Sequence, residues 1–264
     1  MNLTYYWINI DNAINRKNFM EEQFKLRNLN NVRISAITPN KLDEILEDKP
    51  PFFCGYPECK DNKCCDCPIE YSVLCSHLEA IKEGYKSGEE YFIVCEDDIY
   101  MPFNIDFKKM LNYLPTEVEI IQMMVISANH TEHFYNNFYK KNIMFINHIP
   151  ITPSAAFYLM SRKGAEKLLN TFINKATGKY DFINYKHLKL ADVLVFHNCN
   201  TAVSTYPLCI PNINFKSQIH QHHYELHKNA YEKIMEKINN KTDMKNPFIK
   251  DYYPWEDFEK LFKS

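Results

Sequence analysis

Apolar and polar residues alternate in blocks along the chain, and the spacing within each block predicts an element of structure. Residues 3–10 run mostly apolar with the alternation that is typical of a β-strand. The next block is polar except for apolar residues at roughly helical spacing, which are Ile14, Phe19, Phe24 and Leu26. We therefore predict a strand, a loop and a helix at the start of the chain.

The same succession of short apolar runs and amphipathic stretches continues through most of the sequence. It predicts further strands at 32–38, 91–98, 118–127, 141–149 and 155–161, and helices at 69–88, 103–115 and 162–176. The alternation is completed by the segments 189–200 and 202–210, and a polar amphipathic helix is predicted from residue 224. Strands that alternate with helices form a mainly parallel sheet covered on both faces, so the pattern predicts an α/β fold.

Three consecutive carboxylates, Glu96, Asp97 and Asp98, follow the apolar run "YFIVC". In parallel sheets, ligands bind at the carboxyl ends of the strands, which is where this cluster falls. Carboxylate oxygens suit Mg²⁺ and Mn²⁺, which proteins often hold together with substrate phosphates. The chain has no glycine-rich phosphate loop, so a bound nucleotide diphosphate would be held through a metal ion. The alternative interpretation is a solvated acidic turn after a strand.

Composition excludes several classes of protein. A net charge of −2 over 264 residues gives no electrostatic footprint for nucleic acid or for an anionic membrane. No apolar run approaches the roughly 20 residues that span a bilayer. The N-terminal sequence "MNLTYYWINID" lacks the pattern of a secretory signal. These features predict a cytoplasmic protein without a membrane span.

Five of the nine cysteines lie in one stretch, "FFCGYPECKDNKCCDCP", at Cys54, Cys59, Cys64, Cys65 and Cys67. Their spacing fits the paired pattern of structural zinc only loosely. Disulfides are not the default in a chain without a secretory signal. Free thiols, disulfides and zinc therefore all stay open for this stretch, which reads as an insertion at about 50–68.

Several short motifs occur in an order and spacing that resemble glycosyltransferase family 25. They are "YWINIDNAINRKNF", "EYSVLCSHLEAI", "YFIVCEDDIYM", "VEIIQMM", "SAAFYLMSRKGAEKLL" and "LADVLV". The family includes lipopolysaccharide-type galactosyltransferases and collagen hydroxylysine galactosyltransferases. The resemblance extends over roughly residues 3–220, and it includes the collagen-type members found in large DNA viruses.

The resemblance implies a GT-A-type single-domain fold, a UDP-sugar donor, Mn²⁺ or Mg²⁺, and transfer with inversion at the anomeric carbon. The expected activity moves galactose or glucose to a hydroxyl of a saccharide or of a hydroxylysine-containing protein. The expected catalytic domain is 1–223 with the Cys-rich insertion, followed by a C-terminal helical tail at 224–264. For a viral protein, the expected location is the host cytoplasm.

The metal is expected to bind Asp98 and Glu96, with help from a late histidine. The sequence "SQIHQHH" offers three histidines, of which His220 is favoured because imidazole suits Mn²⁺. An inverting transfer needs a general base for the acceptor hydroxyl. Asp192 in "KLADVLVF" matches a family aspartate and is the predicted base, with a helix N-cap as the alternative role and Asp181 as the alternative base.

The donor is expected to contact residues from several segments of the chain. These are Asn9, Arg16, Ser76, His77, Asp97 and Ser154. Arg16 suits a phosphate because a guanidinium binds its oxygens bidentately, although a surface ion pair is the alternative. For Ser76 and His77, the alternative to donor binding is a structural role in their helix.

Two other functions are weighed against the transferase. One is a catalytically silent family member that acts as a Cys-rich, zinc-stabilised interaction protein. The other is a Mg²⁺-dependent phosphotransferase, which the missing phosphate loops disfavour. The intact carboxylates at 96–98 and 192 favour the transferase.

Overall fold

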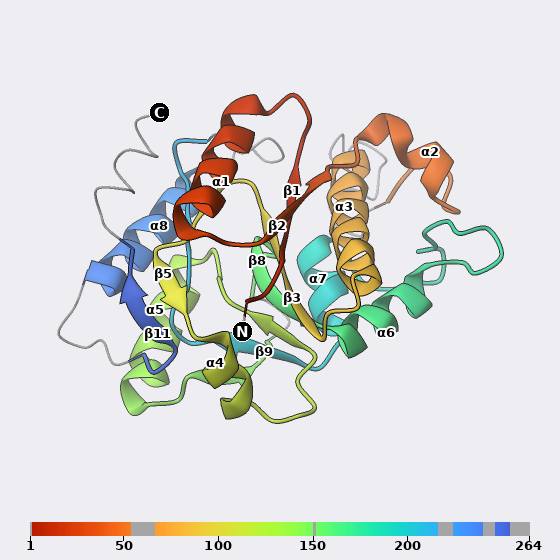
Figure 1. The fold of residues 1–264 in the computed structure, drawn as a ribbon. Coiled ribbons are helices and arrows are strands. Elements are labelled where there is room, and N and C mark those ends of the chain that lie inside the picture. Colours follow the sequence, from red (N-terminus) through yellow and green to blue (C-terminus); the bar gives the residue numbers. More distant parts are fainter. Residues whose placement is uncertain (1, 54–66, 150–151, 216–223, 240–245, 254–264) are drawn as a thin grey trace.

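A seven-stranded mixed sheet forms the centre of the structure (Figure 1). The structure is a computed structural model, and it describes residues 2–53, 67–149, 152–215, 224–239 and 246–253. The strand order is β2-β1-β3-β8-β6-β9-β7. The strands are β1 (Tyr5–Asn9), β2 (Asn31–Ser35), β3 (Tyr91–Glu96), β6 (Ile120–Gln122), β7 (Phe145–Asn147), β8 (Phe157–Ser161) and β9 (Thr201–Ser204). β7 and β8 run antiparallel to their neighbours, while the other strands share one direction.

Helices cover both faces of this sheet. They are α1 (Ile14–Arg27), α2 (Leu42–Ile45), α3 (Cys67–Lys86), α4 (Phe107–Tyr113), α5 (Ala128–Asn137), α6 (Arg162–Phe172), α7 (Ala191–His197) and α8 (Tyr224–Asn239). The buried apolar residues of α2, α3, α6 and α7 form one core, and those of α1, α4 and α8 belong to another. The described chain therefore has the predicted α/β class, with a mostly parallel sheet between helical layers.

Side-chain alternation along the strands explains the two cores. In β1, Tyr5 and Trp7 belong to the core under α1, whereas Tyr6 and Ile8 belong to the core under α3. Successive side chains of a strand point to opposite faces, so a central strand covered by helices on both sides is apolar on both faces. β1 is apolar from Tyr5 to Ile8, and its last residue, Asn9, is polar. All five residues of β1 are buried.

Two predicted elements differ from the structure. The strand predicted at 118–127 is limited to β6, and α5 follows at Ala128, capped by the Ser127 side chain, which accepts from the His130 N–H. The helix predicted at 103–115 begins only at Phe107, because β5 (Phe103–Ile105) pairs with β11 (Ile249–Tyr252). Both differences follow from local capping and long-range pairing rather than from apolar periodicity.

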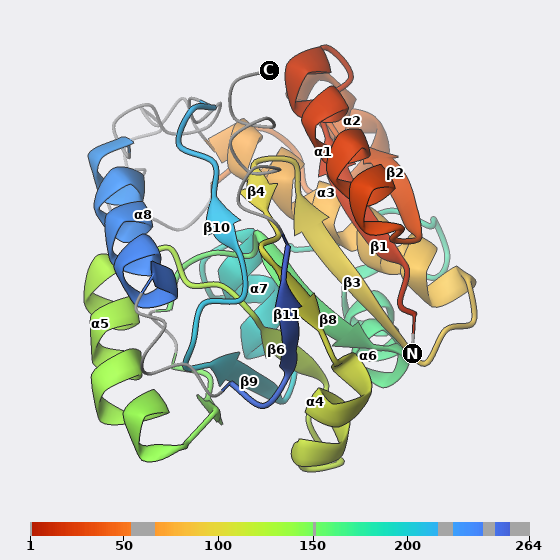
Figure 2. The ribbon, with the colours of Figure 1, turned by 60° about the vertical axis from the view of Figure 1, so that its left-hand side comes forward.

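The C-terminal part of the described chain packs on the rest of the molecule. Figure 2 shows α8 beside α5. β11 pairs with β5, and both strands are labelled in Figure 1. β10 (Ile210–Pro211) likewise pairs with β4 (Ile99–Tyr100), directly after the acidic cluster. The predicted division into a catalytic unit and a tail from residue 224 stays a prediction, and α8 itself contributes to the core through Ile234 and Ile238.

Four cysteines of the described residues are free thiols, and they are Cys75, Cys95, Cys199 and Cys209. Cys67, the last cysteine of the predicted insertion, is buried in an apolar cluster with Leu190. The other four cysteines of the insertion lie outside the described residues. In the part of the chain that the structure describes, no helix combines the length and the apolar character that crossing a membrane requires.

Gly84 sets how closely α3 approaches the sheet. A Cβ placed on Gly84 would lie 2.4 Å from the ring of Phe92, which is fully buried in β3. We predict that Gly84→Ala lowers the free energy of unfolding by about 1–3 kcal/mol, because overpacking outweighs the gain in helix propensity. Urea unfolding measures this, and Phe92→Leu in the Gly84→Ala background should recover part of the loss. A more stable Gly84→Ala variant would contradict the close packing.

Candidate active site

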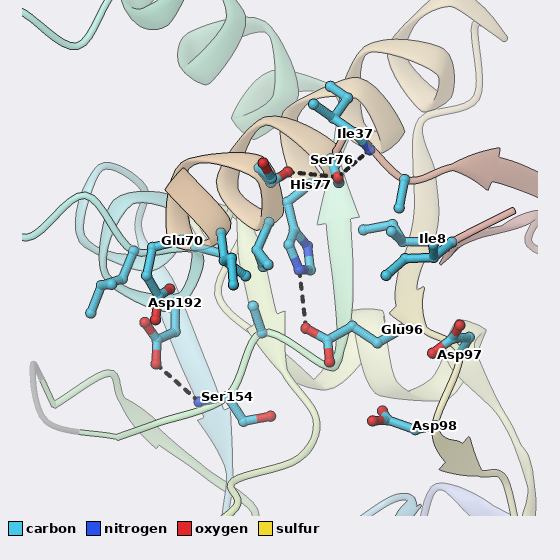
Figure 3. Close-up of a pocket in the computed structure, with 18 of the residues that line it drawn as sticks. Ile8, Ile37, Glu70, Ser76, His77, Glu96, Asp97, Asp98, Ser154 and Asp192 are labelled. Atoms are coloured by element: carbon cyan, nitrogen blue, oxygen red, sulfur yellow. Dashed lines mark hydrogen bonds and ion pairs between the residues drawn. The ribbon is translucent and has the colours of Figure 1, made fainter. Parts of the chain in front are cut away.

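A pocket of about 410 Å³ opens at the carboxyl ends of β1 and β3. Its walls come from the end of each strand, from α3, from the start of α7 and from the segment 153–155 that precedes β8. Figure 3 shows His77 between two acidic groups, with Glu96, Asp97 and Asp98 on one flank and Glu70 and Asp192 on the other. The strand ends therefore bring the predicted acidic cluster into a concave site.

Asp97 is the most fully bonded of the three consecutive carboxylates. Arg16 Nη1 donates to its Oδ1 at 2.8 Å, and Asn9 Nδ2 donates to its Oδ2 at 2.6 Å. Arg33 Nε donates in turn to Asn9 Oδ1 at 2.8 Å. Burial raises the pKa of Asp97, while Arg16 and Asn9 act in the opposite direction. With both oxygens bonded, Asp97 anchors the cluster to α1 and β1.

The Asp98 carboxylate accepts fewer hydrogen bonds than the Asp97 carboxylate. Its Oδ2 accepts from Arg16 Nη1 at 3.1 Å, and its Oδ1 has no hydrogen bond within the described residues. Burial, and then the charges of Glu96 and Asp97, raise the pKa of Asp98 to about 7 against the lowering effect of Arg16. The Asp98 side chain is 27% exposed, so it stays within reach of a ligand in the pocket.

Glu96 is oriented by a buried histidine. His77 Nε2 lies 3.2 Å from Glu96 Oε1, and His77 Nδ1 lies 3.2 Å from the Tyr158 hydroxyl. Burial raises the pKa of Glu96, but the His77 hydrogen bond and the charges of His77 and Arg16 prevail and lower it. His77 is 0% exposed, so its imidazole supports Glu96 as a buried part of the pocket wall.

Asp192 lies in the first turn of α7 and faces the pocket from the other flank. Its Oδ2 accepts from the Ser154 backbone N–H at 3.2 Å, and its Oδ1 accepts from the Val193 N–H at 2.9 Å. Burial raises the pKa of Asp192, and these two hydrogen bonds oppose that rise. The N-cap of α7 is Leu190, so Asp192 is not the N-cap. A partly buried carboxylate with a raised pKa in a pocket suits a general base.

Ser154 has a backbone conformation that L-residues rarely adopt. Its φ is 98°, which is in the left-handed region. Such conformations persist only where the surroundings hold them, and they cluster at functional sites. Its N–H bonds Asp192, while its carbonyl accepts from Gln122 Nε2 at 2.9 Å.

Of the other predicted site residues, Ser76 and Asn9 lie at the pocket or next to it. Ser76 lines the pocket, but its hydroxyl donates to the Ser72 carbonyl and accepts from the Ile37 N–H, so it joins α3 to the segment after β2. Asn9 is buried and bonded to Asp97. The predictions that these residues contact a donor stay predictions. His220 lies outside the described residues.

Sequence reasoning missed two ionisable residues of the pocket lining. Glu70, in the first turn of α3, is a buried carboxylate on the Asp192 flank. His227, on α8, lines the pocket, and its charge lowers the pKa of Glu96. Glu70 resembled an ordinary acidic residue near a helix start, and His227 resembled a polar helix position. The alternative base Asp181 accepts from the Ile183 N–H and does not line the pocket as described.

The charge balance of the pocket is the feature that bears on its ligand. The described lining includes five carboxylates and a single arginine, with no lysine. They are Glu70, Glu96, Asp97, Asp98, Asp192 and Arg16. A dianionic ligand would meet net repulsion unless a cation accompanied it. The pocket therefore favours ligands that arrive with a cation.

A divalent metal is compatible with this chemistry. Asp98 Oδ1 and Glu96 Oε2 make no hydrogen bond within the described residues, and both residues line the pocket. No three His, Cys, Asp or Glu side chains of the described chain form a ready-made metal site. Mg²⁺ and Mn²⁺ often take only one or two protein carboxylates and complete their shell with water and phosphate oxygens. The residues present fit such an open site.

Comparisons with known proteins give one family. The model of glycosyltransferase family 25 (LPS biosynthesis protein) matches residues 2–184. Comparison with curated proteins yields no match. Among solved structures, the chain is similar to a glycosyltransferase involved in the glycosylation of the major capsid of PBCV-1, with 9% sequence identity and a TM-score of 0.29. That match covers 77% of this chain and 94% of the other.

The raised pKa of Asp98 predicts a pH-dependent cost in stability. An unfolded aspartate titrates near pH 4, whereas folded Asp98 titrates at about 7. The folded state therefore binds more protons between these values, and stability falls as the pH rises through this window. Asp98→Asn should raise the free energy of unfolding at pH 8, on the order of 1–3 kcal/mol, and the gain should shrink toward pH 4.

Urea unfolding of both proteins across pH 4–8 measures this gain, with exposed Asp43→Asn as the matched control. Equal stability of the parent and Asp98→Asn at pH 8 would show that Arg16 already compensates the cluster.

Proposed function

Because the chain belongs to glycosyltransferase family 25, we propose that it transfers galactose or glucose from a UDP-sugar to a hydroxyl acceptor with the help of a divalent metal. The acceptor class is a saccharide or a hydroxylysine-containing protein. The observation that carries the proposal is the pocket charge, with five carboxylates facing one arginine. Such a pocket can bind a nucleoside diphosphate when a cation lies between the pocket carboxylates and the diphosphate.

Glu96 and Asp98 are the residues that would hold Mn²⁺ or Mg²⁺. Bound there, the ion would supply charge neutralisation for the leaving diphosphate, the Lewis-acid role of a catalytic metal. His77 keeps Glu96 in place, and Arg16 ties Asp98 to Asp97. His227 lines the same part of the pocket and is an additional candidate ligand, while His220 stays the ligand favoured by the sequence.

One wall of the pocket is apolar and suits the base of a nucleoside. Ile8, Ile37 and Pro39 line the pocket beside the acidic cluster, and Ser76 fixes the Ile37 backbone through its N–H. An apolar wall next to polar groups is the usual setting for a flat ring. We place the uracil against this wall, with its diphosphate directed toward Glu96 and Asp98.

Asp192 is the proposed base. As the acceptor oxygen attacks the anomeric carbon, its proton passes to Asp192, and the bond from that carbon to the diphosphate oxygen breaks. Attack from the face opposite the leaving group inverts the configuration. Asp192 suits this role because it is separated from the acidic triplet and holds a raised pKa through burial.

The first test is a panel of UDP-sugars. Purified protein treated with a chelator should release no uridine diphosphate above background from UDP-glucose or UDP-galactose. Mn²⁺ or Mg²⁺ should restore the release, and acceptor saccharides or hydroxylysine peptides should increase it. Equal turnover with and without the chelator would contradict the metal-dependent proposal, and the absence of release from every donor would contradict the transferase.

The second test concerns Asp192. Asp192→Asn should lower kcat by about 10²–10⁴-fold, because removing a general base costs roughly this much. Calorimetry should show unchanged binding of uridine diphosphate with Mn²⁺. In the parent enzyme, activity should fall as the pH drops through the raised pKa of Asp192, above the usual aspartate range near 4, because only the deprotonated carboxylate accepts the proton.

Asp181→Asn is the matched control for Asp192→Asn, because it makes the same chemical change at the alternative base. It should leave kcat within about twofold of the parent enzyme, the change expected where no catalytic interaction is lost. A large loss in Asp181→Asn with little loss in Asp192→Asn would move the base to Asp181.

A further inference from the structure

Gln122, the last residue of β6, is a buried amide next to the pocket whose bonds the proposed reaction does not explain. It is 0% exposed, and its Nε2 lies within 3.4 Å of three successive carbonyl oxygens. The distances are 3.4 Å to Thr152, 3.3 Å to Pro153 and 2.9 Å to Ser154. One side chain thus binds residues 152–154, which lie shortly before β8.

The orientation of this amide is determined by its surroundings. If the two ends were exchanged, Oε1 would face three carbonyl oxygens, which cannot donate to it. In the observed orientation, Oε1 has no hydrogen-bond partner within the described residues. A buried acceptor without a partner costs stability, so the bonds of Nε2 are made at the expense of the other end of the side chain.

The segment that Gln122 binds contains the left-handed residue Ser154. The Ser154 carbonyl accepts from Gln122, its hydroxyl accepts from the Ala156 N–H at 3.2 Å, and its own N–H donates to Asp192. Figure 3 shows this last bond directed from the segment to the Asp192 carboxylate. A residue with φ of 98° keeps its N–H in this direction only while its neighbours hold the turn.

We propose that Gln122 is a positioning residue: its amide holds the Ser154 turn in the left-handed conformation that presents the Ser154 N–H to Asp192. Without the amide, Ser154 relaxes toward negative φ, and its N–H turns away from the carboxylate. Asp192 then keeps only the bond from Val193 and loses its fixed direction toward the pocket. The kinetic consequence rests on the proposed role of Asp192 as the base.

The test replaces the amide and then relieves the strain. Gln122→Met has a similar volume and no donor, so it should lower kcat on the order of tenfold while the donor KM stays within about twofold, because misorientation of a catalytic group acts on the chemical step. The acidic limb of the pH profile should move to higher pH, since loss of the Ser154 N–H removes a bond that lowers the pKa of Asp192.

Ser154→Gly in the Gln122→Met background should recover part of kcat, because glycine adopts positive φ without strain. Thr205→Val is the matched control. It removes a buried hydroxyl that donates to the Ile143 and Met144 carbonyls, away from the pocket lining. This control should lower stability without moving the pH profile.

A crystal structure of Gln122→Met provides a readout that does not depend on activity. The expected result is a negative φ at Ser154 and a broken bond to Asp192. If Ser154 keeps its left-handed φ, or if Thr205→Val and Gln122→Met change the pH profile equally, the proposal is overturned. If the parent protein transfers no sugar, the proposed function fails, while the φ of Ser154 in the variant still decides whether Gln122 holds the turn.

Discussion

The structure of the site depends on the crowding of negative charge at the carboxyl end of β3, beside the end of β1. Glu96, Asp97 and Asp98 leave β3 together, and Arg16 is the only arginine in the described pocket lining. One guanidinium bonds both Asp97 and Asp98, and burial still raises the pKa of each carboxyl, that of Asp98 to about 7. A pocket built in this way is stable enough to fold and remains short of positive charge.

Adjacent carboxylates acquire different roles from this constraint. Asp97 turns toward α1 and β1, where Asn9 and Arg16 bond both of its oxygens. Glu96 is held by His77, whose Nε2 lies 3.2 Å from Glu96 Oε1. Asp98 keeps an oxygen directed to no protein partner in the described chain. The same residue types therefore divide into one structural anchor and two groups available to a ligand.

The opposite flank is organised by backbone groups rather than by charge. Within the described residues, Asp192 accepts hydrogen bonds from main-chain N–H groups alone, one of which belongs to the strained Ser154. Burial makes this carboxylate more basic, while the two N–H bonds direct it and limit the rise of its pKa. The carboxylates on one flank thus suit binding of a cation, while Asp192 on the other flank suits acceptance of a proton.

The helical layers explain how such distant segments converge. α3 carries Ser76 and His77 over the sheet, and its close approach at Gly84 brings it near β3. α5, which the sequence pattern did not predict, packs beside α8, and Lys237 bonds Glu132 at 2.8 Å between them. α8 then extends to the pocket with His227.

The sequence by itself determined the α/β class, the two-sided apolar strands and the position of the acidic triplet at the carboxyl end of β3. These features are local, because alternation of apolar residues and the end of an apolar run are read from neighbouring positions. It also indicated Asp192, although through family resemblance rather than through periodicity.

Only the tertiary structure decided which carboxylate Arg16 bonds, that His77 supports Glu96, and that Gln122 holds the Ser154 turn. Each of these contacts joins residues from different elements, and burial and hydrogen bonding there depend on how helices pack on the sheet. Polar residues such as Gln122 and Glu70 carry no periodic signal. Their surroundings, and therefore their chemistry, exist only once the chain is folded.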